Sequence, residues 1–354
     1  MKLFTVGPVE MFPETLEISG RQLPYFRTPE FSEIMLENER LLKESVGAPT
    51  EAKTVFLTAS GTGAMEAAVI NCFTEADKLL IINGGSFGQR FSDICRIHRI
   101  PYDEIKLPFG DTLTAKRMAE ADGQGYSALL VNLHETSAGQ LYDIAMLSEF
   151  CQRNHMYLIV DAISAYGADE IDFEKYNVDV LILSSQKALA LSPGISMAVI
   201  SARMYEERVL KTDSGSLYLD FKEHIANMTR GQTPFTPAVG ILLELHHRLK
   251  QIQSQGILQM NKEMQSLAER FREQLQQKGF TIPAYPLSNA LTPVLLKPHA
   301  REMYEALKEE YGLIVTPNGG SLADTVIRIG HLGNVKWQDY EELLAAMVQI
   351  RERL

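Results

Sequence analysis

The most regular pattern in the chain is a series of short apolar runs between residues 54 and 201. Seven runs rich in aliphatic residues occupy 54–59, 78–83, 103–108, 127–133, 157–162, 179–185 and 195–201. Their nearly continuous apolar character is typical of strands that are buried on both faces of a parallel sheet. The pattern therefore predicts a central seven-stranded sheet, and the close spacing of the last runs predicts that one strand is antiparallel.

Helix-like segments lie between several of these runs, at 64–73, 90–99, 114–121 and 145–154. Strands that alternate with helices predict an α/β fold, in which helices flank a mainly parallel sheet. After about residue 250 the pattern changes. Amphipathic helical stretches at 261–278, 300–311 and 336–352 then alternate with strand candidates at 290–297 and 324–330.

These changes of pattern divide the chain into three parts. We predict an N-terminal arm (1–25), a large domain (26–250) and a smaller C-terminal α+β domain (251–354). Residues 211–238 show weak periodicity and many Gly, Ser, Thr and Pro residues. A long irregular stretch inside a compact protein is usually functional.

Composition and charge exclude several classes of protein. The chain has 354 residues, with 34 Lys and Arg against 45 Asp and Glu, and its formal net charge is −11. Such an acidic chain repels phosphate, so we expect no nucleic-acid partner and no anionic membrane surface. No apolar run approaches the roughly 20 residues that a membrane span needs. Cys72, Cys95 and Cys151 form no CxxC pair and predict buried thiols, with no metal site, in a cytoplasmic protein.

Polar residues follow directly after several predicted strands. In an open α/β sheet such residues meet at the carboxyl edge, where ligands bind. The sequence therefore predicts one cleft that gathers Ser60-Gly61-Thr62, Gly84-Gly85-Ser86-Phe87, His134-Glu135-Thr136, Asp161 and Gln186-Lys187.

Three of these groups have chemistry that fits one cofactor. Ser60-Gly61-Thr62 opens a helix, whose N-terminus favours a phosphate, although it matches neither GxGxxG nor the P-loop. Burial lowers a lysine pKa and frees the amine of Lys187 for Schiff-base chemistry. Asp161 ends an apolar strand, where a carboxylate needs a cationic partner. Taken singly, each also fits a structural role, as a capped turn, a surface lysine and a capping aspartate.

Together, the three groups predict a site for pyridoxal 5′-phosphate (PLP). A protein that uses PLP must hold its phosphate, its ring nitrogen and its aldehyde. Phe87 is placed to cover the ring, and Thr136 is placed to hydrogen-bond the phenolic oxygen.

The sequence resembles the class V aminotransferases, a branch of the fold-type I PLP enzymes, and most nearly the alanine–glyoxylate, serine–glyoxylate and 2-aminoethylphosphonate–pyruvate group. The motifs that carry the resemblance span almost the whole chain in family order. They are TVGPVEMFPETL (5–16), FRTPEFSEIM (26–35), SGTGAMEAA (60–68), NGGSFGQRF (83–91), HETSAG (134–139), VDAISAYG (160–167), SSQKALALSPG (184–194), TPFTPAVG (233–240) and IRIGHLG (327–333).

The resemblance implies a role for each matched residue. Lys187 would form the Schiff base, Asp161 would pair with the ring nitrogen, Phe87 would stack on the ring and Thr136 would touch its 3′ oxygen. Arg328 would grip the substrate carboxylate, to which a guanidinium donates two parallel hydrogen bonds. Gly7 would also lie on the substrate side. The phosphate would be surrounded by Ser60, Gly61, Thr62 and Gln186, together with Thr236 from the partner subunit of a homodimer.

The implied function is transfer of an amino group from a small donor, alanine or serine, to a 2-oxo acid, glyoxylate or pyruvate. The alternative is a 2-aminoethylphosphonate–pyruvate aminotransferase, whose phosphonate would need a further cation such as Arg27 or Arg230. Two departures leave the donor open. Phe87 stands where relatives often have Trp or Tyr, and Phe26 stands where they often have His.

Other functions fit less well. Cysteine desulfurases carry His before the lysine and a reactive Cys late in the chain, whereas here Gln186 precedes Lys187 and no cysteine follows Cys151. A non-catalytic relative would be expected to lack Lys187 or Asp161, and a Rossmann dehydrogenase would need GxGxxG. His246 and His247 lie on a helical run, and His331, near Arg328, is given no role.

Overall fold

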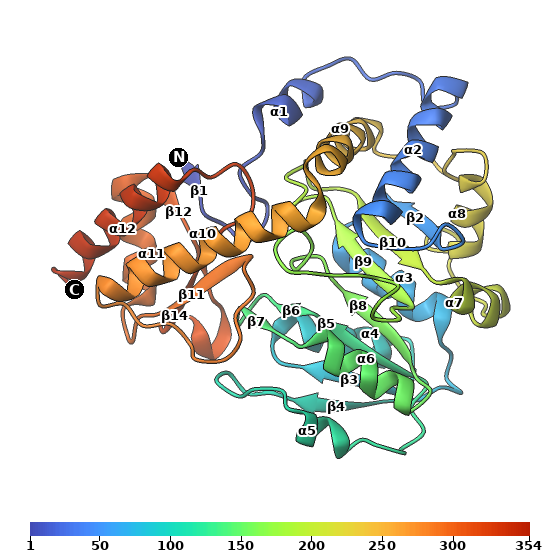
Figure 1. Ribbon diagram of the computed structural model, residues 1–354, viewed down its shortest axis with the longest axis horizontal. Coiled ribbons are helices and arrows are strands. Elements are labelled where there is room, and N and C mark those ends of the chain that lie inside the picture. The colour runs from blue at the N-terminus through green and yellow to red at the C-terminus, as the bar shows by residue number, and fades with distance from the viewer.

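A seven-stranded sheet organises the large part of the molecule (Figure 1). The computed structural model describes residues 1–354. The strand order is β2 (Lys53–Leu57), β10 (Ser196–Ile200), β9 (Val180–Ser184), β8 (Tyr157–Asp161), β5 (Ala128–Asn132), β3 (Leu79–Asn83) and β4 (Tyr102–Lys106). β10 runs antiparallel to β2 and β9, and all other neighbouring strands pair in parallel. All seven predicted strands and the antiparallel one are confirmed.

The sheet is apolar on both faces, which explains the continuous apolar runs. In β8, Leu158 and Val160 belong to one hydrophobic core and Ile159 to the other. The first core includes α2 (Pro29–Ser45), α6 (Ile144–Arg153) and α9 (Val239–Gln255), and the second includes α3 (Gly61–Cys72) and α4 (Ser86–Ile97). Helices therefore cover both faces, as predicted. The remaining short elements of this part are α5 (Ala115–Ala119), α7 (Ala202–Glu207) and the hairpin of β6 (His134–Glu135) and β7 (Gln140–Leu141).

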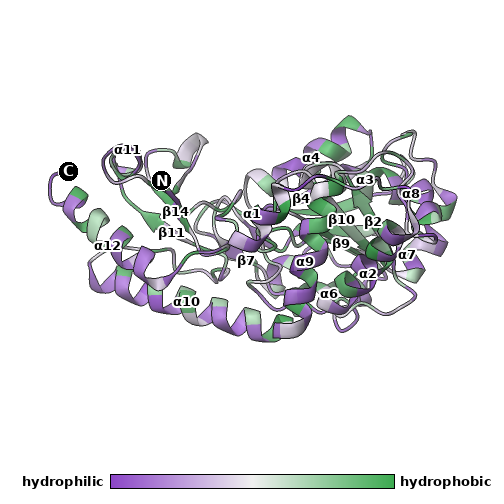
Figure 2. Ribbon diagram, turned by 90° about the horizontal axis from the view of Figure 1, so that it is seen from above, coloured by the Kyte–Doolittle hydropathy of each residue, from purple (hydrophilic) through white to green (hydrophobic).

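The C-terminal part is built on a smaller antiparallel sheet. Its strands are β11 (Leu291–Leu295), β14 (Val326–Gly330) and β13 (Thr316–Pro317). The helices α10 (Ile257–Gln277), α11 (Ala300–Tyr311) and α12 (Trp337–Arg351) confirm the three helical stretches expected here. Figure 2 shows hydrophilic residues along much of the outer side of α10 and hydrophobic residues in the central sheet. The break between α9 and α10 is Gly256, whose φ of +85° favours glycine.

The N-terminal residues run across both parts of the molecule. β1 (Lys2–Leu3) pairs with β12 (Leu313–Ile314), and Phe4 lies in the core of the C-terminal part. Further along, α1 (Pro13–Ser19) contacts α9 of the large part. The segment predicted as an arm therefore contacts both the C-terminal part and the large part. Its pairing with β12 had no signal in the sequence.

Residues 211–238 are less irregular than their weak periodicity indicates. They contain α8 (Phe221–Met228), with the Asp220 side chain accepting hydrogen bonds from the backbone N–H groups of Lys222 and Glu223. Its buried residues are Phe221, His224, Ile225 and Met228. The prediction of an irregular segment is wrong here because so short a helix shows its apolar stripe over only two turns.

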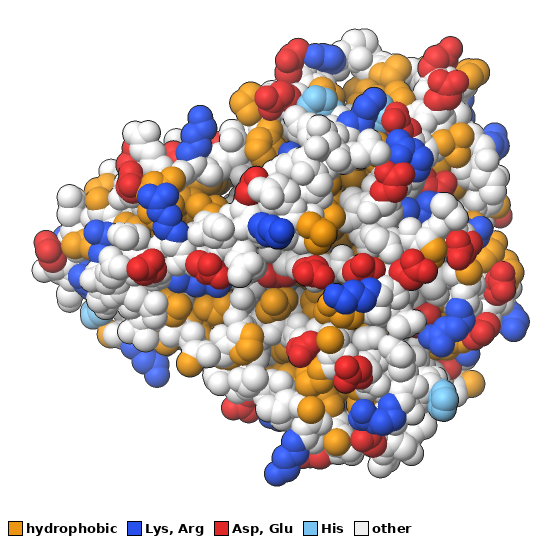
Figure 3. All heavy atoms as spheres, in the orientation of Figure 1, with side chains coloured by type: hydrophobic (Ala, Val, Ile, Leu, Met, Phe, Trp, Pro, Cys, Tyr) orange, Lys and Arg blue, Asp and Glu red, His pale blue; other side chains and the backbone are white.

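The remaining global predictions concern the surface and the cysteines. Cys72, Cys95 and Cys151 are buried free thiols, as expected. None of the helices combines the length and the apolar character that crossing a membrane would require. On the face shown in Figure 3, acidic and basic side chains are interspersed.

Candidate active site

Strand ends from the large part bring the predicted cofactor residues to one edge of the sheet. Asp161 is the last residue of β8, and Asn132, the last residue of β5, lies opposite it in the strand register. Lys187 follows β9, the next strand along. The positional argument from the sequence holds because β5, β8 and β9 are parallel and end at the same edge.

Lys187 is buried and held by the N-terminal segment. Its exposed fraction is 7%, and its Nζ donates a hydrogen bond to the carbonyl oxygen of Val6. Gly7 has a φ of +138°, and a Cβ there would lie 2.7 Å from Lys187 Cδ. Only glycine fits, so Gly7 does lie beside the lysine. Burial, assisted by the charges of Arg328 and Arg90, lowers the pKa of Lys187 to about 8, although Asp161 opposes the shift.

Asp161 is equally buried, and two donors orient its carboxylate. The Ile163 backbone N–H donates to Oδ1 at 2.9 Å, and Asn132 Nδ2 donates to Oδ2. Burial nevertheless raises the pKa of Asp161 to about 6. The charge of Lys187 lowers this pKa, which shows that the two groups act on each other within one site.

Thr136, in the loop after β5, contacts the turn that follows Asp161 on one side and the C-terminal part on the other. Thr136 Oγ1 lies 2.6 Å from Ser164 Oγ. Its carbonyl oxygen accepts a hydrogen bond from Arg328 Nη1 at 3.1 Å. The neighbouring His134 is buried, which lowers its pKa to about 3, and its Nε2 has no hydrogen-bond partner. His134 is therefore neutral at ordinary pH.

Arg328 is the contribution of the C-terminal part to this site. It projects from β14, and its Nη2 donates to the Pro317 carbonyl oxygen at 2.8 Å. The buried Nε has no partner. Burial lowers the pKa of Arg328 to about 10, so the side chain stays cationic near neutral pH.

The predicted phosphate residues lie at the start of α3. Ser60 is the N-cap residue and is exposed, with no capping hydrogen bond from its side chain. Gly61 is in close contact with the turn after β8, since a Cβ there would lie 2.3 Å from Ile163 Cδ1. Thr62 Oγ1 accepts a hydrogen bond from Arg90 Nη1 at 2.9 Å. The open N-terminus of α3 suits an anion.

Gln186 and Thr236 are placed differently from these residues. Gln186 Oε1 accepts a hydrogen bond from Ser184 Oγ at 2.5 Å, which draws the side chain toward the end of β9. Thr236 is exposed. Its loop is attached to the β2–α3 turn by the backbone N–H of Ala238, which donates to Thr58 Oγ1 at 3.0 Å.

Two residues of this site, Arg90 and Asn132, were missed in the sequence, and for Glu135 the sequence predicted the place but not the contacts. The guanidinium carbon of Arg90 lies 4.8 Å from the centroid of the Phe87 ring, and its Nη1 donates to Thr62 Oγ1, so Arg90 links Phe87 to the N-terminus of α3. Glu135 accepts from the Gly88 backbone N–H at 3.0 Å and fixes the start of α4. Asn132 ends an apolar strand, the same signal that identified Asp161. Arg90 and Glu135 lie inside recognised motifs, but only the fold shows what they contact.

Phe87 and Arg328 line one cleft between the two parts of the molecule. Its volume is about 790 Å³, and residues 106–109 and 318–322 also line it. Among the residues left open, Arg27 donates to Gln232 Oε1 at 3.0 Å and to the Thr233 carbonyl oxygen at 2.8 Å. Arg27 therefore holds the loop that leads to Thr236.

The other residues left open lie outside this cleft. Arg230 is exposed and donates to Asn227 Oδ1 at 2.7 Å. His331 is buried in the C-terminal part, where its Nε2 lies 2.8 Å from Thr292 Oγ1. His246 lies on α9, with its Nε2 2.6 Å from Glu37 Oε2 of α2, so it connects two packed helices.

Comparison with known proteins identifies the family. The sequence model of the class-V aminotransferases matches residues 24–335. The chain belongs to this family.

The similar proteins include aminotransferases from bacteria and an archaeon. The chain is 29% identical to a 2-aminoethylphosphonate–pyruvate transaminase of Pseudomonas aeruginosa, over 87% of this chain and 85% of that protein. It is 28% identical to an uncharacterized aminotransferase of Methanocaldococcus jannaschii, over 94% and 87% of the two chains. The structure of alanine–glyoxylate aminotransferase from Nostoc sp. superposes with a TM-score of 0.92 at 25% identity, over 99% of this chain and 94% of that one.

This aminotransferase uses PLP, and the residues present fit that cofactor. A cationic ring nitrogen would satisfy the buried Asp161 carboxylate, and the Lys187 amine is the one lysine nitrogen buried beside it. The buried Nε2 of His134 and Nε of Arg328 have no hydrogen-bond partner in the protein, which is consistent with a polar ligand at this site. The cofactor phosphate could bind at the N-terminus of α3, beside Thr62 and Arg90.

The raised pKa of Asp161 predicts how the cofactor-free aminotransferase responds to pH. Its carboxyl has a pKa of about 6 when folded and 3.8 when unfolded, so the folded state binds the proton more tightly. The contribution of Asp161 therefore leaves the free energy of unfolding unchanged below about pH 4 and lowers it by about 3 kcal/mol between about pH 4 and about pH 6. Asp161→Asn removes this loss, since Asn132, whose Oδ1 is unpartnered, can turn its amide to meet the introduced one.

Urea denaturation of the apoenzyme at about pH 4 and about pH 7 measures this effect. The difference in free energy of unfolding between Asp161→Asn and wild type should grow by about 3 kcal/mol from the lower to the higher pH. The exposed Asp213 serves as the control, because Asp213→Asn should show no such growth. If the free energy of unfolding changes equally with pH in Asp161→Asn and in wild type, Asp161 is not a buried carboxylate with a raised pKa.

Proposed function

We propose that this enzyme transfers the amino group of alanine or serine to glyoxylate or pyruvate. The observation that carries the proposal is the single buried guanidinium of Arg328, with a free Nε, at the cleft that also holds Phe87. One such group is suited to the one carboxylate that every small amino acid and 2-oxo acid carries. The Nostoc and Pseudomonas proteins, whose names specify glyoxylate and pyruvate as acceptors, support this class of acceptor.

The positions of other cations favour alanine or serine over 2-aminoethylphosphonate. A phosphonate would need a second cationic group near the substrate, and Arg27 and Arg230 are the candidates from the sequence. Arg27 donates to the 232–234 loop, and Arg230 is exposed and bonded to Asn227. Neither guanidinium is free in the cleft, and Lys106, the other cation that lines the cleft with Arg328, is already ion-paired, so the phosphonate donor remains the second candidate.

We assign the cofactor residues as follows. Asp161 would hold the ring nitrogen in its protonated form, Phe87 would stack on the ring, and Thr136 would hydrogen-bond the phenolic oxygen. When bound, PLP accepts the electron pair that is left when the substrate α-carbon loses its proton. Residues that would hold the phosphate are Ser60, Gly61, Thr62 and Gln186, with Thr236 of the partner subunit.

Lys187 is the residue that moves the proton. Its pKa of about 8 leaves about a tenth of the amine neutral at pH 7, and a neutral amine can accept the α-proton. Gly7 and the Val6 carbonyl oxygen hold the side chain from the N-terminal side. Arg328 would fix the substrate carboxylate, so that the α-carbon faces Nζ.

The purified protein, reconstituted with PLP, tests this assignment. We expect a visible absorbance band that disappears on borohydride reduction and is absent in Lys187→Ala. Each candidate donor is then added without acceptor, and conversion of the band to that of pyridoxamine phosphate is followed. Conversion by alanine or serine supports the proposal. Conversion by 2-aminoethylphosphonate alone selects the second candidate, and a wild type that stays colourless would refute the assigned cofactor site.

The role of Arg328 predicts a loss of affinity for the acceptor. Arg328→Ala should weaken binding of the 2-oxo acid by about 2–5 kcal/mol, the usual cost of removing one member of a buried charge pair. The apparent affinity from half-reactions with pyridoxamine phosphate enzyme measures this loss. Arg230→Ala is the matched control and should change the affinity little, because Arg230 is exposed. An unchanged affinity in Arg328→Ala would reject the role.

We also propose that the enzyme is a homodimer with shared active sites. Thr236 is exposed, and so are the nearby apolar side chains Leu217 and Tyr218, of which Tyr218 stacks on Phe235. Exposed apolar side chains gathered in one region often mark an interface. The cytoplasmic location stays a prediction, supported by three cysteines that are all free.

Sedimentation of the holoenzyme tests the dimer. We expect a mass twice the 39.7 kDa of one chain. Thr236→Val should also lower cofactor retention without changing that mass, because the side chain would contribute one hydrogen bond to the phosphate. A monomeric holoenzyme with full activity would contradict the shared site.

A further inference from the structure

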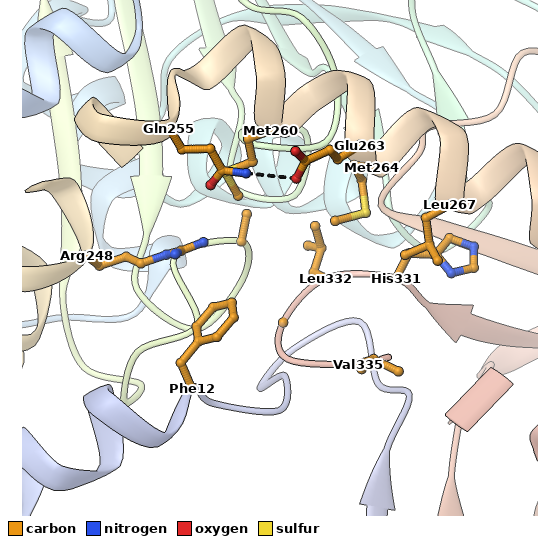
Figure 4. Close-up of a pocket in the computed structure, with 12 residues that line it drawn as sticks. Phe12, Arg248, Gln255, Met260, Glu263, Met264, Leu267, His331, Leu332 and Val335 are labelled. Carbon is orange, nitrogen blue, oxygen red and sulfur yellow. Dashed lines mark hydrogen bonds between the residues drawn. The ribbon is translucent and has the colours of Figure 1, made fainter. Parts of the chain in front are cut away.

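A second, smaller cavity lies between the two parts of the molecule (Figure 4). Its volume is about 260 Å³. Its walls come from the N-terminal segment, α9, α10 and residues 331–335, and Ala188, which follows Lys187, closes one side. No residue assigned to the cofactor or the substrate lines it.

Arg248 on α9 is a buried cation without a counterion in this cavity. Its exposed fraction is 7%, and no carboxylate lies within ion-pair distance of its guanidinium. Nη1 donates to Gln251 Oε1 at 3.1 Å, and the buried Nε has no partner. Figure 4 shows the guanidinium extending from α9 toward the cavity, above the ring of Phe12. Buried charges in proteins are normally paired, so this one requires an explanation.

The stacking of Arg248 on Phe12 satisfies only part of this requirement. The guanidinium carbon lies 4.4 Å from the ring centroid, which is a favourable cation–π distance. A ring face accepts no N–H hydrogen bond in the guanidinium plane, so Nε stays unsatisfied. Burial also lowers the pKa of Arg248, while the charge of Glu14 acts on it in the opposite sense.

The wall opposite Arg248 is mainly apolar. Met260, Met264 and Leu267 of α10 face Leu332 and Val335 of the C-terminal loop. Methionine side chains adapt to ligands of varied shape. The one acidic residue of the lining, Glu263, accepts hydrogen bonds from Gln255 Nε2 at 2.8 Å and Gln259 Nε2 at 2.9 Å, so its carboxylate is occupied by other partners.

We propose that this cavity is a second ligand site, for a small carboxylate with a branched apolar body. The carboxylate would pair with the Arg248 guanidinium, and the apolar body would lie against Met260, Met264 and Leu332. The volume is slightly below the roughly 300 Å³ at which drug-sized pockets begin, which restricts the ligand to a few carbon atoms. A free phosphate or sulfate would fill the cationic end but leave the apolar wall uncovered.

A ligand in this site would contact both parts of the molecule and the residue next to Lys187. Phe12 and Arg248 belong to the N-terminal segment and α9, whereas Met264 and Leu332 belong to the C-terminal part. Occupation would therefore stabilise one relative position of the two parts. The same two parts supply Lys187 and Arg328, which gives this site a physical route to the reaction.

Calorimetric titration of the holoenzyme with 4-methylpentanoate tests the proposal. This acid has the required carboxylate and branched body but no amino or oxo group, so it cannot react. We expect wild type to bind it and to bind the neutral 4-methylpentanamide about tenfold or more weakly, the loss typical of one hydrogen bond to a charged group. No binding of the acid at millimolar concentration would overturn the proposal.

Matched variants identify where the acid binds. Arg248→Gln should weaken binding of the acid at this second site about tenfold or more. Arg328→Gln should remove any binding of the acid in the substrate cleft but leave its affinity for the second site unchanged. The reverse result would place the acid in the substrate cleft and refute a second site. If Arg248→Gln does not fold, Met264→Phe decides, because it fills the cavity without removing the cation. Binding that is unaffected by Met264→Phe would also overturn the proposal.

Discussion

Two ionisable side chains, Lys187 and Asp161, lie buried at the carboxyl edge of the seven-stranded sheet, and the active site is organised around the cost of burying them. Desolvation lowers the pKa of the lysine and raises that of the aspartate, so each loses part of its charge near neutral pH. Asn132 and the Ile163 N–H limit this cost at Asp161. A cofactor with a protonated ring nitrogen and an aldehyde would offset the remaining cost at both residues, and its binding would then stabilise the fold.

The second constraint is that the site is completed from outside the large part. The N-terminal segment reaches Lys187 through Val6 and Gly7, and β14 brings Arg328 to the Thr136 carbonyl oxygen. Both contacts join segments that are far apart in the chain, and both depend on how the C-terminal part sits on the large one. The cavity around Arg248 lies at the same junction, so a ligand there and a substrate at Arg328 would respond to the same movement.

Much of the fold could be predicted because its signals are local. The strands are buried on both faces, which makes them continuously apolar, and α10, α11 and α12 are long enough to show helical periodicity. α8 was missed because eight residues show little periodicity, and the β1–β12 pair because two-residue strands show none. The candidate site followed from the same logic, since polar residues after parallel strands must meet at one edge.

The sequence by itself determined the α/β architecture, the set of residues at the sheet edge and the family, because hydrophobic period and motif order are properties of neighbouring residues. Only the tertiary structure decided which side chains those residues contact. It placed Arg90 between Phe87 and Thr62, used Arg27 to hold the 232–234 loop, and left Arg248 without a counterion. The reason is physical: the partner of a long, charged side chain is set by side-chain direction and by segments distant in sequence, and neither leaves a periodic pattern.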